Sequence, residues 1–342
     1  MRALVLGGSV FVGRSLVDEL LAQGHQVTVF NRGQTPVELP AGVRQLRGDR
    51  KDHAQVRQVL ALQDYDVVYD TSGYLPEDTE VMVELFEGHT GHYIYTSTAA
   101  VYERRWYAPV TEDFPYNLVE GGAYARGKIG AEQLLVQAHQ EKGFPASIIR
   151  PWMVFGPGNP LMAREQLFFL RVEQGRTVLL PGNGYGHLQY GHVRDLAKAF
   201  VMMAGNPRTF GQSYNVTGPD MVTMNGYLQI IAKLAGRDVE VVYLDHWEAT
   251  KAADQRRDLF QFPWQYSRIP SIQKAKEDFG FWPEYDAQRC TEDTYRWYKA
   301  QHLDQMAYDF SFEDQLLATY GGDSQRHGRI TPGGDMPQVA EG

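Results

Sequence analysis

The sequence predicts an α/β fold in which a doubly wound parallel sheet precedes a smaller C-terminal α/β region that binds substrate. Short apolar runs alternate with helix-period segments over the first half of the chain, and a glycine-rich turn follows the first run. Beyond about residue 160 this alternation weakens into interleaved loops and helices. We therefore expect a dinucleotide-binding domain at 1–160, to which a segment at about 186–217 returns, and a substrate-binding region at 161–310. The tail, 321–342, is rich in Gly, Pro, Asp and Gln, which predicts disorder.

The first 32 residues predict a complete βαβ unit. Residues 4–6 form an apolar run typical of a buried strand, Gly7-Gly8 interrupts it, apolar residues then recur at helical spacing over 12–21, and 26–30 predicts a second strand. Such a turn lets backbone amides and a helix N-terminus face a pyrophosphate, because no Cβ blocks the approach. Gly13 lets the helix pack closely on the strand. The pattern predicts a nucleotide site; a glycine turn in some other α/β protein is the alternative.

The residues after the second strand bear on the choice of cofactor. A carboxylate there would accept hydrogen bonds from the adenosine ribose and repel a 2′-phosphate. The sequence instead has Asn31-Arg32-Gly33, and the planar fork of Arg32 can pair with a 2′-phosphate. We therefore predict NADP in preference to NAD. The alternative is that Arg32 stacks on the adenine or points to water.

The remaining elements continue the alternation. Further strands are expected at 43–47, 65–70, 92–96, 144–149, 213–217 and 239–243, and further helices at 52–62, 77–88, 121–142, 162–174, 193–204, 223–235, 271–279 and 286–301. Asp49 follows the third strand, where it either reads an adenine amino group or caps the next helix. Thr71-Ser72-Gly73 lies at the carboxyl end of the fourth strand, the edge of a doubly wound sheet where ligands sit.

A tyrosine and a lysine open the helix after the fifth strand. Tyr124 and Lys128 are four residues apart, so they share one helix face. A nearby ammonium group favours the phenolate, and the tyrosine can then exchange a proton with an alcohol or a carbonyl. Thr98, at the end of the preceding strand, can hold the same substrate oxygen. A chance pair is the alternative, but its place after a nucleotide-binding unit favours catalysis.

Composition excludes several classes of function. No apolar run reaches the ~18 residues that a membrane helix needs. The net charge of -9 disfavours nucleic-acid binding, and Cys290, the single cysteine, suits a reducing cytoplasm. His187 and His192 have no partner at metal-ligand spacing, so we expect no metal site and expect His192 to cap or pack near a helix start. A serine hydrolase is improbable, because the chain has no Gly-x-Ser-x-Gly elbow.

Taken together, these motifs resemble the extended short-chain dehydrogenase/reductases, the NAD-dependent epimerase/dehydratase family. The match covers about residues 1–300 and rests on the following stretches: Gly7-Gly-Ser-Val-Phe-Val-Gly13, Thr96-Ser-Thr-Ala-Ala-Val-Tyr102, Tyr124-x-x-x-Lys128, Arg150-Pro with Gly156-Pro-Gly158, and His192-Val-Arg-Asp195-Leu-Ala. The resemblance implies a Rossmann domain with bound NAD(P). It also implies that Thr98 has the Ser/Thr role, that Tyr124 is the acid/base, and that Lys128 holds the nicotinamide ribose and lowers the tyrosine pKa.

The resemblance also implies partners and a fuller set of site residues. The helices at 77–88 and 124–142 would pair with their copies in a homodimer, with Val81, Leu85, Leu134 and Leu135 as apolar material. We assign the cofactor to Gly7, Ser9, Val10, Phe11, Val12, Gly13, Asn31, Arg32, Asp49, Arg50, Thr71, Ser72, Gly73, Tyr124, Lys128 and Trp152. We assign a small-molecule substrate to Thr98, Met153, Asn159 and Gln189.

Two residues depart from the family pattern. Val10 occupies the place of the middle glycine, and Leu188 stands where an arginine often binds a nucleotide-sugar diphosphate. The stretches 31–33, 70–74 and 181–195 resemble a subgroup related to chloroplast stem-loop RNA-binding proteins. Two functions follow: an NAD(P)-dependent oxidoreductase or epimerase/dehydratase acting on a sugar-like or other hydroxyl or carbonyl substrate, or an RNA-binding protein on a dehydrogenase scaffold with little redox turnover. The intact tyrosine–lysine pair and the acidic charge favour the enzyme.

Overall fold

The computed structural model divides into two units, which are described separately. It describes residues 1–61, 63–103, 108–119, 121–162, 164–256, 259–260 and 269–333. The first unit comprises Met1–Val154, Gly191–Pro219 and Pro270–Glu284; the second comprises Phe155–Tyr190, Asp220–Ile269 and Tyr285–Gly342. The recruitment of residues 270–284 to the first unit was not predicted from the sequence.

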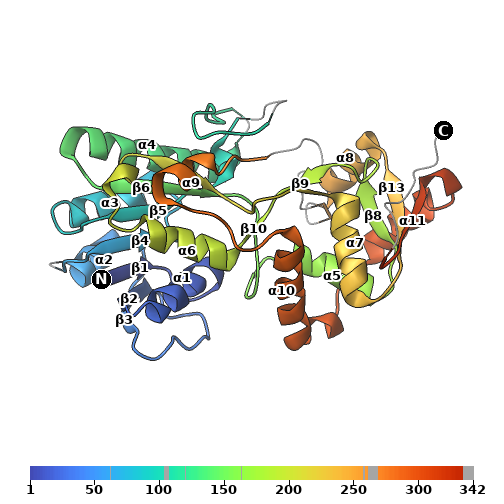
Figure 1. Cartoon of the computed structure of the whole chain (residues 1–342), viewed down its shortest axis with the longest axis horizontal. Coiled ribbons are helices and arrows are strands. Elements are labelled where there is room, and N and C mark those ends of the chain that lie inside the picture. Colours follow the sequence, from blue (N-terminus) through green and yellow to red (C-terminus); the bar gives the residue numbers. More distant parts are fainter. Residues whose placement is uncertain are drawn as a thin grey trace. The chain divides into compact units, whose positions relative to one another are not determined.

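A seven-stranded parallel sheet forms the centre of the first unit (Figure 1). Its strands are β1 (Arg2–Leu6), β2 (Gln26–Asn31), β3 (Arg44–Arg47), β4 (Val67–Asp70), β5 (Tyr93–Thr96), β6 (Ala146–Pro151) and β11 (Ser213–Val216), in the order β11-β6-β5-β4-β1-β2-β3. The strand order reverses at β1, which pairs with β2 on one side and β4 on the other. The carboxyl ends of β1 and β4 therefore form the switch point where ligands bind in doubly wound sheets. The predicted fold class is confirmed.

Helices cover both faces of this sheet (Figure 1). One face carries α1 (Phe11–Ala22), α6 (Val193–Met203) and α9 (Gln273–Phe279), and the other carries α2 (His53–Leu60), α3 (Pro76–Phe86) and α4 (Gly122–Lys142). Because both faces are covered, the inner strands are buried along their length, which is why they are nearly continuous apolar runs. Two short 3-10 turns, η1 (Ala99–Val101) and η2 (Pro207–Thr209), complete the unit.

Local signals explain where the helices begin and end. Pro76 occupies the first turn of α3, where its missing N–H is not needed, and Gly143 ends α4 in the left-handed conformation. The side chain of Asp52 caps α2 by accepting from the Gln55 amide at 3.0 Å. The alternative that Asp49 caps this helix is therefore wrong: its carboxylate lies earlier and accepts from the Lys51 amide at 3.0 Å.

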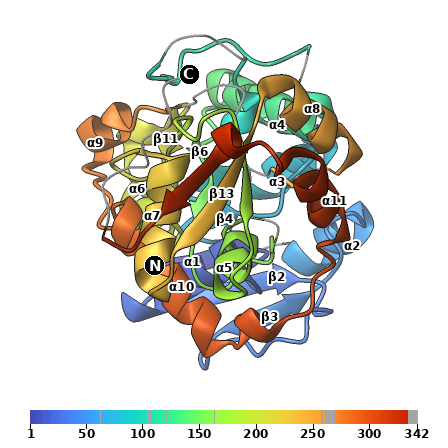
Figure 2. The same cartoon turned by 90° about the vertical axis from the view of Figure 1, so that its right-hand side faces the viewer.

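A three-stranded sheet anchors the second unit. It consists of β8 (Val178–Pro181), parallel to β13 (Val239–Leu244), and β14 (His327–Ile330), antiparallel to β13. Helices α8 (His246–Gln255) and α11 (Ser311–Tyr320) pack against one face, and α5 (Glu165–Glu173) and α7 (Met224–Ala235) lie on the other (Figure 2). The second unit also contains β9 (His187–Leu188), β12 (Val222–Thr223), α10 (Ala287–Ala300), η3 (Leu303–Gln305) and η4 (Ser324–Arg326). Of the other elements, β10 (Gly191–His192) belongs to the first unit, and β7 (Val154–Phe155) includes the last residue of one segment and the first of the next.

The prediction of a disordered tail at 321–342 is wrong for residues 321–333, the part that the structure describes. Residues 327–330 pair with 239–242, and the Ile330 side chain is buried. A polar edge strand that buries a single apolar residue carries almost no sequence signal, which is why composition alone pointed to disorder. Residues 334–342 of the predicted tail lie outside the described residues. Within the described ranges, none of the helices combines the length and apolarity needed to span a bilayer.

Candidate active site

Two turns meet at the switch point of the first sheet. Gly7 follows β1 with φ +114°, and a Cβ there would lie 2.5 Å from the Thr71 Oγ1 atom. Thr71 follows β4 and donates to the Leu6 carbonyl from both its amide (3.1 Å) and its hydroxyl (2.8 Å). A Cβ on Gly13 would lie 2.5 Å from the Gly8 backbone nitrogen, so only glycine lets α1 start this close to the turn. The predicted glycine turn therefore lies beside the predicted loop after β4.

Val10 replaces the middle glycine without backbone strain. Its φ of −138° and ψ of 155° are extended values that any residue adopts, and its side chain is exposed. The positive φ falls instead on Phe11, at +45°. Within the described residues no side chain caps the start of α1, which leaves the amides of its first turn available to an anion. Val12 is partly buried and packs against the core.

A cavity of about 450 Å³ opens beside the end of β2. Ser9, Asn31 and Arg47 line it together with the loop 33–40. The Asn31 amide donates to the Ser9 hydroxyl at 2.9 Å and accepts from Gln45 at 2.9 Å, so it joins the glycine turn to β3. Arg32 is exposed and is not among the residues that line the cavity.

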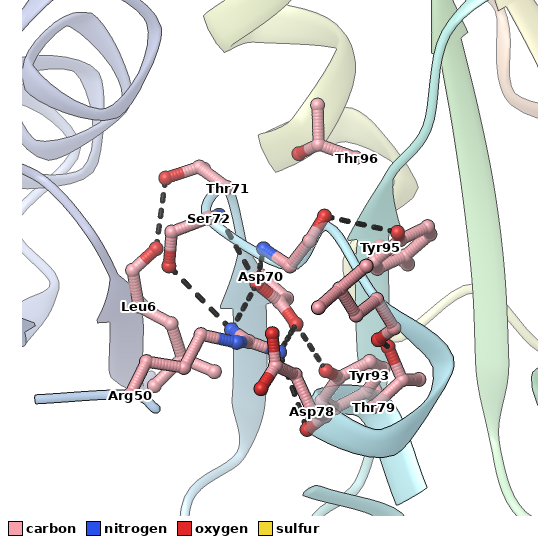
Figure 3. Close-up of polar contacts among 12 residues, drawn as sticks. Leu6, Arg50, Asp70, Thr71, Ser72, Asp78, Thr79, Tyr93, Tyr95 and Thr96 are labelled. Atoms are coloured by element: carbon pink, nitrogen blue, oxygen red, sulfur yellow. Dashed lines mark hydrogen bonds and ion pairs between the residues drawn. The ribbon is translucent and has the colours of Figure 1, made fainter. Parts of the chain in front are cut away.

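A buried carboxylate organises the loop after β4 (Figure 3). Asp70 is fully buried and accepts two hydrogen bonds from the Arg50 guanidinium, both at 2.6 Å, and one from the Tyr93 hydroxyl at 2.5 Å. It also accepts from the amides of Ser72 (3.1 Å) and Gly73 (2.9 Å). Burial alone would raise the pKa of Asp70, but the Arg50 cation and these hydrogen bonds hold it below the usual value. Arg50, assigned to the cofactor, therefore makes a buried ion pair.

The Lys128 ammonium lies at this loop. Its Nζ donates to the Gly73 carbonyl at 2.6 Å and to the Thr96 carbonyl at 2.5 Å, and it faces the rings of Tyr74 and Tyr95 at 4.9 and 4.8 Å from their centroids. Burial lowers the pKa of Lys128 to about 8, and the nearby Asp70 carboxylate offsets only part of this effect. Tyr124, one turn earlier on α4, is half exposed, and its ring lies 6.1 Å from that of Tyr74.

The end of β5 presents three hydroxyl groups. Thr98 is half buried, and its hydroxyl accepts from the Ala100 amide at 3.2 Å, which starts the short η1 turn. The hydroxyls of Thr96 and Ser97 are buried and have no hydrogen-bond partner among the described residues. The strand therefore ends in polar groups next to the carbonyl that holds Lys128.

A second buried ion pair fixes the helix that carries Tyr124 and Lys128. Glu132 of α4 receives three hydrogen bonds from Arg150 at the end of β6, at 3.0, 3.2 and 2.5 Å. The same guanidinium donates to the Tyr102 hydroxyl at 3.0 Å. Because Tyr102 closes the motif that contains Thr98, this pair ties α4 to the end of β5. The sequence motif at Arg150 is explained by this role.

The other assigned residues lie in different units. Trp152 packs near η1, and Met153, with φ +35°, belongs to the first unit. In the second unit, Asn159 is buried and its side chain bonds Glu165 at 2.8 Å and the Leu161 amide at 3.0 Å. Gln189, also in the second unit, is buried. The substrate contacts assigned to these residues stay a prediction.

Two further observations concern residues singled out in the sequence. Leu188 is buried in a two-residue pairing with Val222, so an apolar side chain suits its place. His192 caps α6 by accepting from the Arg194 amide at 3.1 Å, which confirms its predicted place at a helix start. Among the described residues no three His, Cys, Asp or Glu side chains form a group that could hold a metal.

Sequence reasoning missed Asp70, which lies at the centre of the site. The signal was present: a carboxylate ends a strand that is otherwise apolar and buried, and a buried charge needs a buried partner. Nothing in the local pattern identified that partner as Arg50. The two residues are 20 apart in sequence, and Arg50 follows β3, which is separated from β4 by two strands.

Comparison with known proteins shows which family this chain is similar to. Residues 3–217 match the NAD dependent epimerase/dehydratase family. A chloroplast stem-loop binding protein of 41 kDa from Arabidopsis thaliana is 32% identical over 93% of this chain and 84% of its own. A 2-alkyl-3-oxoalkanoate reductase from Stenotrophomonas maltophilia is 28% identical over 70% of this chain and 78% of its own.

Solved structures of this fold extend over most of the chain. A UDP-glucose 4-epimerase from Thermotoga maritima superposes with a TM-score of 0.74, at 19% identity, over 88% of this chain and 100% of its own. A UDP-glucuronic acid 4-epimerase from Bacillus cereus, solved with NAD, gives 0.70 at 20% identity, over 88% and 100%. At these identities the likeness shows the fold alone. By the family match and the 32% identical relative, the chain belongs to the NAD dependent epimerase/dehydratase family.

Proposed function

We propose that the protein is an NAD(P)-dependent oxidoreductase or epimerase/dehydratase that acts on a hydroxyl or carbonyl carbon through Thr98, Tyr124 and Lys128. The observation that carries this proposal is the Lys128 ammonium, buried at the carboxyl edge of the sheet and held by two carbonyls one helical turn after Tyr124. Burying a lysine charge destabilises the fold. A catalytic site that needs a cation near a phenol would explain why a lysine is nevertheless buried here.

In this proposal each side chain has one task. A bound nicotinamide supplies or accepts the hydride. Tyr124 gives its phenolic proton to the substrate oxygen during reduction and takes the hydroxyl proton during oxidation. The Thr98 hydroxyl donates a hydrogen bond to the same oxygen. An ammonium has three N–H groups, and the carbonyls occupy two, so Lys128 keeps one for the nicotinamide ribose or the phenol.

The residues at the switch point fit a dinucleotide. The turn at Gly7 and Gly13 leaves no room for a Cβ, and the open start of α1 offers amides to the pyrophosphate. The cavity beside Asn31 suits the adenosine, and Trp152, Asp49 and the loop after β4 are the other assigned contacts.

NADP is the cofactor that we favour. Arg32 and Arg47 both lie near the end of β2, with Arg47 lining the cavity, and Asn31 stands where a carboxylate would repel a 2′-phosphate. The cavity lining also contains Glu38, whose charge opposes this preference. Fluorescence titration with NADPH and NADH decides the point: Arg32→Ala and Arg47→Ala should each weaken NADPH binding more than NADH binding. Tighter NADH binding that neither substitution alters would overturn the preference.

The substrate class is a sugar-like or other polyol or carbonyl compound. The buried Leu188 argues against recognition of a nucleotide diphosphate at that position. A substrate panel tests the function: absorbance at the reduced-nicotinamide band detects net redox, and mass spectrometry of the products detects epimerisation or dehydration. Absence of turnover on alcohols, ketones, sugars and nucleotide sugars with either cofactor would contradict the proposal that the protein is an enzyme.

RNA binding is the second candidate, favoured by the name of the 32% identical relative, a stem-loop binding protein. The net charge of -9 opposes it, because phosphate contacts need a basic surface. We therefore expect no strong binding of RNA. A gel shift with structured RNA at submicromolar protein that weakens as salt rises would promote this candidate over the enzyme.

A further inference from the structure

The Arg50–Asp70 ion pair bridges two distant parts of the first sheet. Arg50 follows the edge strand β3, and Asp70 ends the central strand β4, with β1 and β2 between them. The carboxylate is fully buried and the guanidinium nearly so. The Arg50 Nε atom has no partner among the described residues, so the guanidinium binds Asp70 through its two terminal nitrogens. Figure 3 shows this pair beneath the loop after β4.

The loop is folded around the pair. The Asp70 carboxylate accepts from the Ser72 and Gly73 amides, and a Cβ on Gly73 would lie 2.9 Å from the Asp70 carboxylate and 3.0 Å from the Arg50 guanidinium. On its other side, the Gly73 carbonyl accepts from Lys128 at 2.6 Å. A single residue, Gly73, therefore links the ion pair to the ammonium that serves Tyr124.

Stability alone gives a poor reason for this arrangement. Replacing a buried ion pair by apolar side chains of similar volume is often neutral or stabilising, because both charges lose their hydration. The pair also places a carboxylate next to a second buried cation. The groups in direct contact with the Lys128 ammonium are two carbonyls and two aromatic rings.

We propose that Arg50 and Asp70 are positioning residues for proton transfer, which set the place and the charge of Lys128 through the Thr71–Gly73 loop. The proposal rests on the proposed function of Tyr124 and Lys128 and adds two residues to it. Neither residue touches the substrate in this account.

Several charged or titratable groups act on Lys128. They are Asp70 and Tyr74 from β4 and its loop, Tyr95 from β5, Arg50 from the turn after β3, and Glu132 from its own helix. Tyr124 lies one turn before Lys128 on the same helix. Burial lowers the pKa of Lys128 most; the Asp70 carboxylate raises it and the Arg50 guanidinium lowers it. Removing Asp70 should therefore lower the pKa of Lys128, and removing Arg50 should raise it. A general loosening of the fold would shift this pKa in the same direction in both variants.

The experiment follows Lys128 directly and needs no substrate. Lysine labelled with ¹³C at Cε is titrated by NMR, with the Lys128 signal assigned from Lys128→Met. Asp70→Asn should lower the Lys128 midpoint and Arg50→Gln should raise it, each by ~0.5 pH unit or more. Arg171→Gln, which breaks the buried pair with Glu313 in the second unit, is the matched control and should leave it unchanged.

Two outcomes would overturn the proposal: shifts in the same direction, or midpoints that stay at the wild-type value. If a single variant fails to fold, the double variant Arg50→Gln/Asp70→Asn carries the test, because neither charge is left unpaired. It should shift the midpoint, because the loop that holds Lys128 loses the carboxylate that binds its Ser72 and Gly73 amides; an unchanged midpoint contradicts the proposal. Failure here leaves the role of Tyr124 intact, whereas unaltered turnover of Tyr124→Phe removes the proposed function itself.

Discussion

Lys128 carries its charge where burial opposes it. Its side chain is almost fully buried, its two hydrogen-bond partners are carbonyls, and its pKa falls to about 8. An unfolded lysine titrates near 10.4, so the unfolded chain holds one more proton than the folded chain between these two pH values. Folding stability from this group therefore rises with pH through that window.

This shift predicts a pH-dependent effect of Lys128→Met. Below pH 8 the folded wild type bears the full penalty of the buried charge, about 3 kcal/mol. The free energy of unfolding of the variant relative to wild type should therefore be most favourable near pH 7 and should decline towards pH 10. Urea unfolding at several pH values measures it, with exposed Lys233→Met as the control. A difference that does not change with pH would contradict the buried cation.

Some residues of the site could be predicted from the sequence, and others could not. Tyr124, Lys128 and the glycine turn were predictable because their chemistry depends on spacing within one segment. The pair of Asp70 and Arg50 was not, because it depends on which strands become neighbours. The family resemblance assigns Arg50 to the cofactor, whereas the structure places its guanidinium in the buried pair with Asp70.

At the scale of elements, the start of α1 depends on close contact with the glycine turn. Gly13→Ala would place a Cβ 2.5 Å from the Gly8 nitrogen and 2.9 Å from its Cα, both backbone atoms that cannot rotate away. We expect a loss of ~1–3 kcal/mol in unfolding free energy, the range for overpacking, with weaker NADPH binding. Thermal unfolding and fluorescence titration measure these. Gly322→Ala, with no atom within 4 Å of its Cβ, is the matched control; equal behaviour of the two variants would count against the tight turn.

The elements of the two units differ in how well they could be predicted. In the first unit the inner strands β1, β2 and β4 are largely apolar and buried, and all seven strands were expected within a few residues. In the second unit β8 pairs with β13 about 60 residues later, and β14 follows after about 80 more. Two-residue strands such as β9 and β12 are defined only by their pairing, so no local sequence pattern predicts them.

At the scale of the whole molecule, we propose a homodimer. Val81 and Leu135, two of the four residues expected at its interface, are instead buried in the core of the protomer. Leu85 and Leu134 are half buried on α3 and α4 and are the apolar side chains that remain. Light scattering at micromolar concentration should give twice the chain mass, and Leu85→Glu with Leu134→Glu should halve it. A monomeric mass for the wild type would refute the dimer.

The location of the protein stays a prediction. A single buried cysteine suits a reducing compartment, which favours the cytoplasm. The name of the Arabidopsis relative places that protein in the chloroplast.

The most direct test of the central claim is the turnover of Tyr124→Phe on a substrate found in the panel. Phenylalanine keeps the ring and removes only the ionisable hydroxyl, so NADPH binding should survive. The rate should fall by ~100-fold or more, the range for loss of a positioned acid/base. Tyr185→Phe, which alters a similarly exposed tyrosine in the second unit, should keep the wild-type rate. Wild-type turnover by Tyr124→Phe would show that another group transfers the proton and that the site has been misassigned.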